Sequence, residues 1–132
     1  MRKLRNLAII TIVLILAGCA STGKLTPSGA DADFISNWYK VLYSEAGVVD
    51  ATMTSLGALY KAGELPDTVK QQAVIAHTQF SSDYSKAVAA LVSYYTSPTD
   101  VTKSAANSAC IQVQVQAAAI TAISILQTKA VK

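Results

Sequence analysis

Residues 34–60 read FISNWYKVLYSEAGVVDATMTSLGALY, and their apolar side chains recur in alternating steps of three and four residues. This spacing places them along one face of an α-helix. The stripe consists of Ile35, Trp38, Leu42, Val49, Leu56 and Leu59, with Glu45 and Thr52 at the two remaining positions. The sequence therefore predicts a helix over residues 31–62. Asp31 or Asp33 caps its start, and Gly63 follows its end.

A second stripe with the same spacing predicts a helix over residues 67–96, after the tight connection that contains Pro66. Its members are Val69, Ala73, Ala76, Phe80, Tyr84, Ala87, Leu91 and Tyr94. A third helix is predicted over residues 98–129, with Ser97 as its N-cap and Pro98 at its first position. Three long helices joined by very short loops must run antiparallel. We therefore predict an all-α, up-down-up antiparallel three-helix bundle as one domain over residues 31–132.

The third segment is ambiguous in two ways. Residues 111–116 alternate as a strand does, but the surrounding alanines favour a helix. As a helix it has two apolar faces, of which one carries Ile111, Val115, Ala118, Ala122, Ile125 and Leu126. The nearly opposite face carries Ala106, Cys110, Val113, Ala117 and Ile120. Because a bundle needs one broad stripe per helix, we predict that this second face contacts a second copy or a partner. The alternative is that both faces are buried within one chain and that the thiol is inert.

Residues 1–18 have the features of a secretory signal peptide. Arg2, Lys3 and Arg5 precede an apolar run over residues 7–17. As a helix, that run would cover about 16 Å, against about 30 Å of hydrocarbon in a bilayer, so it is short for a transmembrane helix. The alternative is a short membrane anchor that is never cut. The tetrapeptide Leu16-Ala17-Gly18-Cys19 resembles the lipobox of bacterial lipoproteins.

The resemblance to lipoproteins implies a lipid anchor. The Cys19 thiol would receive a diacylglycerol, the chain would be cut before it, and the new amino group would take a fatty acid such as palmitate. The residue after the cysteine is Ala20 rather than Asp. In a Gram-negative cell this implies the outer membrane, with the chain facing the periplasm, and in a Gram-positive cell the outer face of the plasma membrane. Residues 19–30 are small, polar and contain Gly and Pro, which predicts a lipidated cysteine followed by a flexible tether.

The charge of the chain argues against a nucleic-acid partner. The whole sequence has a formal charge of +3, and removal of residues 1–18 leaves eight lysines against eight acidic residues. No arginine remains in that part of the sequence. Arginine and basic patches are the usual means of contact with phosphates and bases.

Few residues suggest a catalytic, metal-binding or ligand-binding site. His77 is the sole histidine and has no partner at metal-ligand spacing, so we interpret it as packed or half-exposed. Glu45 lies within the first stripe, and we expect that the bundle splays there or that a tyrosine hydroxyl or a lysine bonds it; the alternative is a buried carboxyl group with a raised pKa. Tyr39 and Tyr43 form an outward pair, either as ordinary surface residues or as a contact. With no nucleophile turn, glycine-rich phosphate loop or Cys-x-x-Cys in the sequence, we expect no enzyme, cofactor or metal.

The sequence thus predicts a lipid-anchored helical envelope protein with a non-catalytic binding or assembly role, whose partner is another protein or itself. A secretion or envelope accessory and a phage-type lysis lipoprotein both remain open. The alternative is a carrier of a small apolar ligand held between the helices, where Gly47, Gly57 and the alanines of the third helix would leave room. A cavity of roughly several hundred Å³ would favour the carrier.

Overall fold

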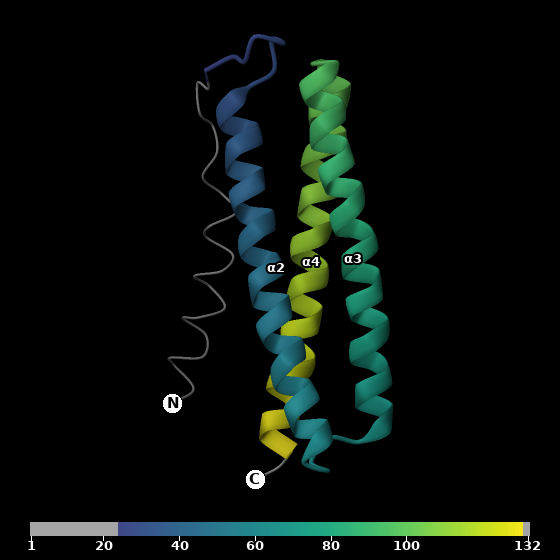
Figure 1. Ribbon diagram of the computed structural model, residues 1–132. Coiled ribbons are helices and arrows are strands. Elements are labelled where there is room, and N and C mark those ends of the chain that lie inside the picture. Colours follow the sequence, from purple (N-terminus) through teal and green to yellow (C-terminus); the bar gives the residue numbers. More distant parts are fainter. Residues whose placement is uncertain (1–23, 131–132) are drawn as a thin grey trace.

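The computed structural model describes the backbone of residues 24–130 and the side chains of residues 24–127. Three helices follow one another: α2 (Ala32–Lys61), α3 (Asp67–Thr96) and α4 (Asp100–Ala130). Successive helices run antiparallel, and each contacts both others, with α3 and α4 sharing the most extensive contact (Figure 1). The predicted all-α three-helix bundle is confirmed. Residues 1–18, where we predict a signal peptide, and Cys19 lie outside the described residues.

The ends of α2 follow the predicted capping chemistry. The Asp31 carboxylate accepts a hydrogen bond from the Phe34 backbone N–H at 2.9 Å, which satisfies one of the free donors of the first turn. At the other end, Gly63 adopts φ +76°, and the Glu64 N–H donates to the Leu59 carbonyl at 2.9 Å. This is a Schellman ending, which needs the left-handed conformation that glycine adopts without strain.

The start of α4 differs from the prediction. Ser97 belongs to the end of α3, where its N–H donates to the Ser93 carbonyl at 2.9 Å. The cap of α4 comes from two threonines. The Thr102 N–H donates to the Thr99 hydroxyl at 3.1 Å, and the Thr99 N–H donates to the Thr102 hydroxyl at 3.0 Å. This reciprocal pair resembles a capping box, so the predicted cap at Ser97 was wrong.

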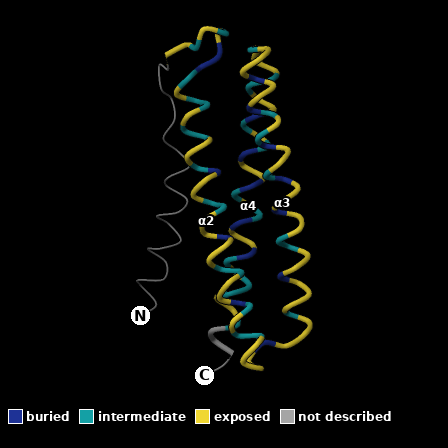
Figure 2. The backbone as a smooth tube through the Cα atoms, in the orientation of Figure 1, coloured by how far each residue is buried: buried dark blue, intermediate teal, exposed yellow. Residues whose placement is uncertain are grey.

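The core runs along the axis of the bundle, where the inner faces of all three helices meet (Figure 2). Its largest fully buried side chains are Leu42, Leu91, Ile120, Val49, Val113 and Cys110. The first stripe is therefore the inner face of α2, as the spacing indicates. Trp38 is only half-buried and packs against the edge of this core. The tightest part of the stripe is thus aliphatic and lies farther along α2.

Residues 24–30 form a turn folded against the bundle. Leu25 pairs with Asp31 in an isolated β-bridge, and the Ala32 N–H donates to the Lys24 carbonyl at 2.7 Å. The turn is closed by the Thr26 N–H, which donates to the Ala30 carbonyl at 2.7 Å, and Ala30 is fully buried. The predicted flexible tether is therefore wrong for residues 24–30. Small residues with Gly and Pro suit a tight turn as well as a linker.

Asp31 ties this turn to the other two helices. Its backbone N–H donates a hydrogen bond to the Tyr94 hydroxyl oxygen of α3 at 2.9 Å. Its carboxylate lies 3.2 Å from the Lys103 Nζ of α4. The Phe34 N–H and the Lys103 ammonium hold the pKa of this carboxyl below its usual value, against the effect of burial. The ring of Tyr94 meets that of Phe34 edge-on, with 5.4 Å between centroids. The end of the bundle where α2 begins is therefore firmly closed.

Candidate functional site

The face of α4 that we expected to contact a second molecule lies inside the bundle. Its five residues are between 0% and 1% exposed: Ala106, Cys110, Val113, Ala117 and Ile120. They pack in one cluster with the inner faces of α2 and α3. The prediction of an interface at these residues is therefore wrong, and the alternative in which Cys110 is an inert part of the core fits the structure. Small side chains on this face let α4 approach its neighbours closely.

The opposite face of α4 is the one that the bundle leaves uncovered. Seven exposed positions follow one another in alternating steps of three and four residues: Ala105, Ser108, Gln112, Val115, Ala119, Ala122 and Leu126. We call this set the outer stripe. Val115 and Leu126 are 55% and 64% exposed. Residues 104–128 contain no charged residue. A repeat of this kind is typical of the seam between two packed helices.

The length and composition of α4 would also permit a membrane crossing. However, core helices of soluble bundles share these properties. A crossing would require α4 to leave its contacts with α2 and α3, which include the fully buried Val113 and Ile120. Polar side chains at Ser108 and Gln112 also interrupt the outer stripe. The outer stripe therefore suits another helix better than a lipid environment.

Cys110 is the free cysteine among the described residues, and it is fully buried. Burial raises the pKa of its thiol to about 12, because the apolar surroundings disfavour the thiolate. Since the thiolate is the reactive form, the folded chain should not form a disulfide through this residue.

We expect Cys110 to resist alkylation in the folded protein and to react at once in denaturant. The Cys19→Ser chain would be treated with iodoacetamide at mildly alkaline pH, so that Cys110 is its one cysteine. Mass spectrometry would then count the adducts with and without denaturant. Rapid modification of the native protein would contradict the buried position.

Glu45 lies half-buried on α2 and faces Gln114 of α4. Burial raises the pKa of its carboxyl group, and a hydrogen bond from the Gln114 side chain partly opposes this. The buried Gln114 Oε1 atom has no hydrogen-bond partner among the described residues. The expected tyrosine or lysine partner was therefore wrong, and the alternative of a raised pKa holds.

Glu45→Gln should stabilise the bundle at neutral pH. Because the folded-state pKa is raised, ionised Glu45 costs the fold free energy above that pKa, and the cost disappears below the ordinary value of 4.5. The stability difference between the variant and the parent should therefore shrink as the pH falls. Urea unfolding at several pH values measures it, with the exposed Glu64→Gln as control. A difference independent of pH would contradict the assignment.

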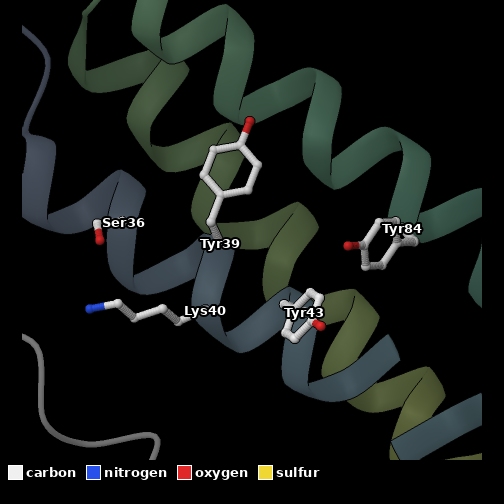
Figure 3. A pocket seen from close by; sticks show the side chains of 5 residues that line it. All are labelled: Ser36, Tyr39, Lys40, Tyr43 and Tyr84. Atoms are coloured by element: carbon white, nitrogen blue, oxygen red, sulfur yellow. The ribbon is translucent and has the colours of Figure 1, made fainter. Parts of the chain in front are cut away.

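Tyr39 and Tyr43 are exposed, as predicted, by 41% and 81%. With Ser36, Lys40 and Tyr84 they line a hollow of about 520 Å³ between α2 and α3. Figure 3 shows Tyr39 extending from α2 toward α3, and Tyr84 extending from α3 toward the same hollow. The hollow is an open depression in the surface. It is not an enclosed space in the core.

Gly47 and Gly57, which we expected to leave room between the helices, do not lie where two helices approach closely. A Cβ atom at Gly47 or Gly57 would meet nothing within 4 Å. Neither glycine lines the hollow between α2 and α3. These positions therefore neither bring two helices together nor enclose a ligand.

His77 is half-buried on α3, as interpreted from its position. Among residues 24–130, no three His, Cys, Asp or Glu side chains gather closely enough to hold a metal ion. Asp83 is a buried acid, 6% exposed, that the apolar pattern did not identify. The Gln79 Nε2 donates to both of its oxygens at 3.1 Å, and the Lys86 Nζ lies 3.3 Å away. The spacing of these partners, four residues before and three after, was the available signal.

No protein-family profile, curated protein or solved structure matches this chain.

Proposed function

We propose that this chain is a lipid-anchored envelope protein with a non-catalytic assembly role, in which two copies pair through the outer stripe of α4. The observation that carries the proposal is the second, exposed seam on a helix whose other face already fills the core. Such a seam lowers the free energy of the protein only when another helix covers it.

A second copy of the chain suits this seam for two reasons. The stripe has no charge between Ala105 and Leu126, so two identical faces can meet without like-charge repulsion. Over that length it would offer roughly 30 Å of helix at 1.5 Å per residue. Two chains that are anchored in one membrane by short N-terminal segments point in the same direction from its surface. Their α4 helices would therefore pair in parallel, with identical positions facing each other across a two-fold axis.

The anchor is tested by metabolic labelling with palmitate. The parent chain should carry label in the envelope fraction, and Cys19→Ser should remain unlabelled as an uncut precursor. An unlabelled parent chain would end the proposal. A secretion or envelope accessory and a phage-type lysis lipoprotein both fit it, and the neighbouring genes distinguish them. A holin and an endolysin would indicate lysis, whereas a secretion cluster would indicate an accessory.

A carrier of a small apolar ligand is the second candidate. The hollow of about 520 Å³ beside Tyr39, Tyr43 and Tyr84 has a suitable volume. Its support is weaker, because the hollow is open to solvent and contains the charged Lys40, whereas apolar ligands are held in largely enclosed sites. Binding of an apolar fluorescent probe that is lost in Tyr84→Lys would favour the carrier.

A further inference from the structure

Three exposed apolar side chains lie at the end of the bundle where α2 and α4 begin and α3 ends. They are Leu25, Tyr95 and Val101, with 71%, 45% and 78% exposure, and we call this surface the anchor-side end. Each comes from a different segment: the turn before α2, the last turn of α3 and the first turn of α4. None of these three side chains packs into the core clusters of the bundle.

The segments of the anchor-side end are fixed to one another. A Cβ atom at Gly29 would lie 3.7 Å from Pro98 Cγ, so the turn lies against the connection between α3 and α4. The Lys103 Nζ of α4 lies 3.2 Å from the Asp31 carboxylate at the start of α2. Figure 1 shows the turn and this connection at the same end of the molecule. The segments that carry the three apolar side chains are therefore held together at the same end of the bundle.

The chain outside the structure is short at this end. Four residues, 20–23, separate Cys19 from Lys24, and the Lys24 carbonyl accepts a hydrogen bond from the Ala32 N–H at 2.7 Å. Even fully extended, the five steps from Cys19 to Lys24 span at most about 17 Å. The opposite end of the bundle lies roughly 45 Å farther away along the helices.

We propose that the anchor-side end rests on the lipid bilayer that holds the chain, with Leu25 and Val101 in the boundary between headgroups and acyl chains. This inference depends on the proposed lipidation of Cys19, because the short segment of residues 20–23 would then keep this end close to the bilayer. Tyr95 suits the same depth, since its ring is apolar and its hydroxyl group can remain hydrated. The bundle would then stand on the membrane with its α2–α3 connection pointing away.

The charges at this end decide which lipids are needed. Lys24 is exposed, and so are Asp33 and Asp100, while Lys103 is paired with Asp31. Acidic and basic groups are thus mixed, and no basic patch is present among the described residues of this end. Apolar contact therefore carries the interaction, and it should form on zwitterionic lipid without any anionic component.

The test uses the full lipidated chain in phosphatidylcholine vesicles. Leu25→Cys would be labelled with an environment-sensitive NBD fluorophore, because buried Cys110 is not accessible to the reagent. Lys61→Cys, exposed at the other end of α2, is the matched control. Val101→Cys repeats the measurement from a different segment, in case the change at Leu25 disturbs the turn. Lipids with a shallow spin label would quench any fluorophore within the bilayer boundary.

We expect a blue-shifted emission and strong quenching at Leu25 and Val101, and neither at Lys61. Weak quenching at all three positions, on protein that stays bound to the vesicles, would overturn this inference and leave the anchor intact. A blue shift without quenching would mean that protein covers this end, which also overturns it. Chain that carries no fatty acid and does not float with the vesicles would end both this inference and the proposed function.

Discussion

We expect Val113→Lys to unfold the domain and Val115→Lys to leave it folded. The two valines are two residues apart on α4, but Val113 is fully buried and Val115 is 55% exposed. A lysine ammonium group at Val113 would lie in the apolar core without a partner, which costs several kcal/mol. The whole domain is stabilised by only about 5–15 kcal/mol. Circular dichroism and chemical unfolding of both full-length variants in detergent measure the effect.

The same pair of variants also tests the outer stripe. Val115→Lys places a charge at a position where two copies would meet, so it should dissociate the pair while the helical signal remains. Sedimentation in detergent would show the change in mass. A Val113→Lys chain as stable as its parent would mean that the inner face of α4 is wrongly assigned. A Val115→Lys chain that stays paired would contradict the outer stripe.

Leu42→Ala should lower the free energy of unfolding by about 3–5 kcal/mol, the range for large aliphatic side chains in tight cores. Leu42 is fully buried on α2, and the bundle can close around the missing atoms only in part. The effect should appear in the urea midpoint with little change in the slope.

Tyr43→Ala is the matched control for Leu42→Ala. It is the next residue along α2 and is 81% exposed, so its replacement should change the stability by less than about 0.5 kcal/mol. Equal effects at the two positions would mean that the apolar stripe of residues 34–60 is not the inner face of the helix.

The architecture could be predicted from the sequence because the residues of each helix show a helical apolar pattern of their own. A stripe of apolar residues in steps of three and four depends on local spacing alone, and Gly63 and Pro66 mark the boundary between α2 and α3. The start of α4 was harder, because Ser97 and Thr99 can both cap a helix. Which one does so depends on where α3 ends, and local spacing does not settle that.

The inward face of α4 could not be predicted from the sequence. Val113 and Val115 are identical side chains, and both faces are alanine-rich. What separates them is the fit to α2 and α3, a tertiary property. The folded turn over residues 24–30 was missed for a related reason. Its attachment to α3 joins Asp31 and Tyr94, 63 positions apart, and no local pattern contains such a contact.

Two anchored copies that pair in parallel through the outer stripe should be cross-linked by a cysteine placed within that stripe. Ala119→Cys and Ala51→Cys are both exposed, and each lies nineteen residues past the start of its helix, at Asp100 and at Ala32. The two positions are therefore at similar depth, but only Ala119 belongs to the outer stripe. Native membranes that contain either full-length variant would be treated with a mild oxidant. We expect a disulfide-linked dimer for Ala119→Cys and a monomer for Ala51→Cys, because identical seam positions face each other in a parallel pair and a disulfide needs Cα atoms within about 7 Å. A monomer for Ala119→Cys, or equal cross-linking of both variants, would contradict the parallel pairing.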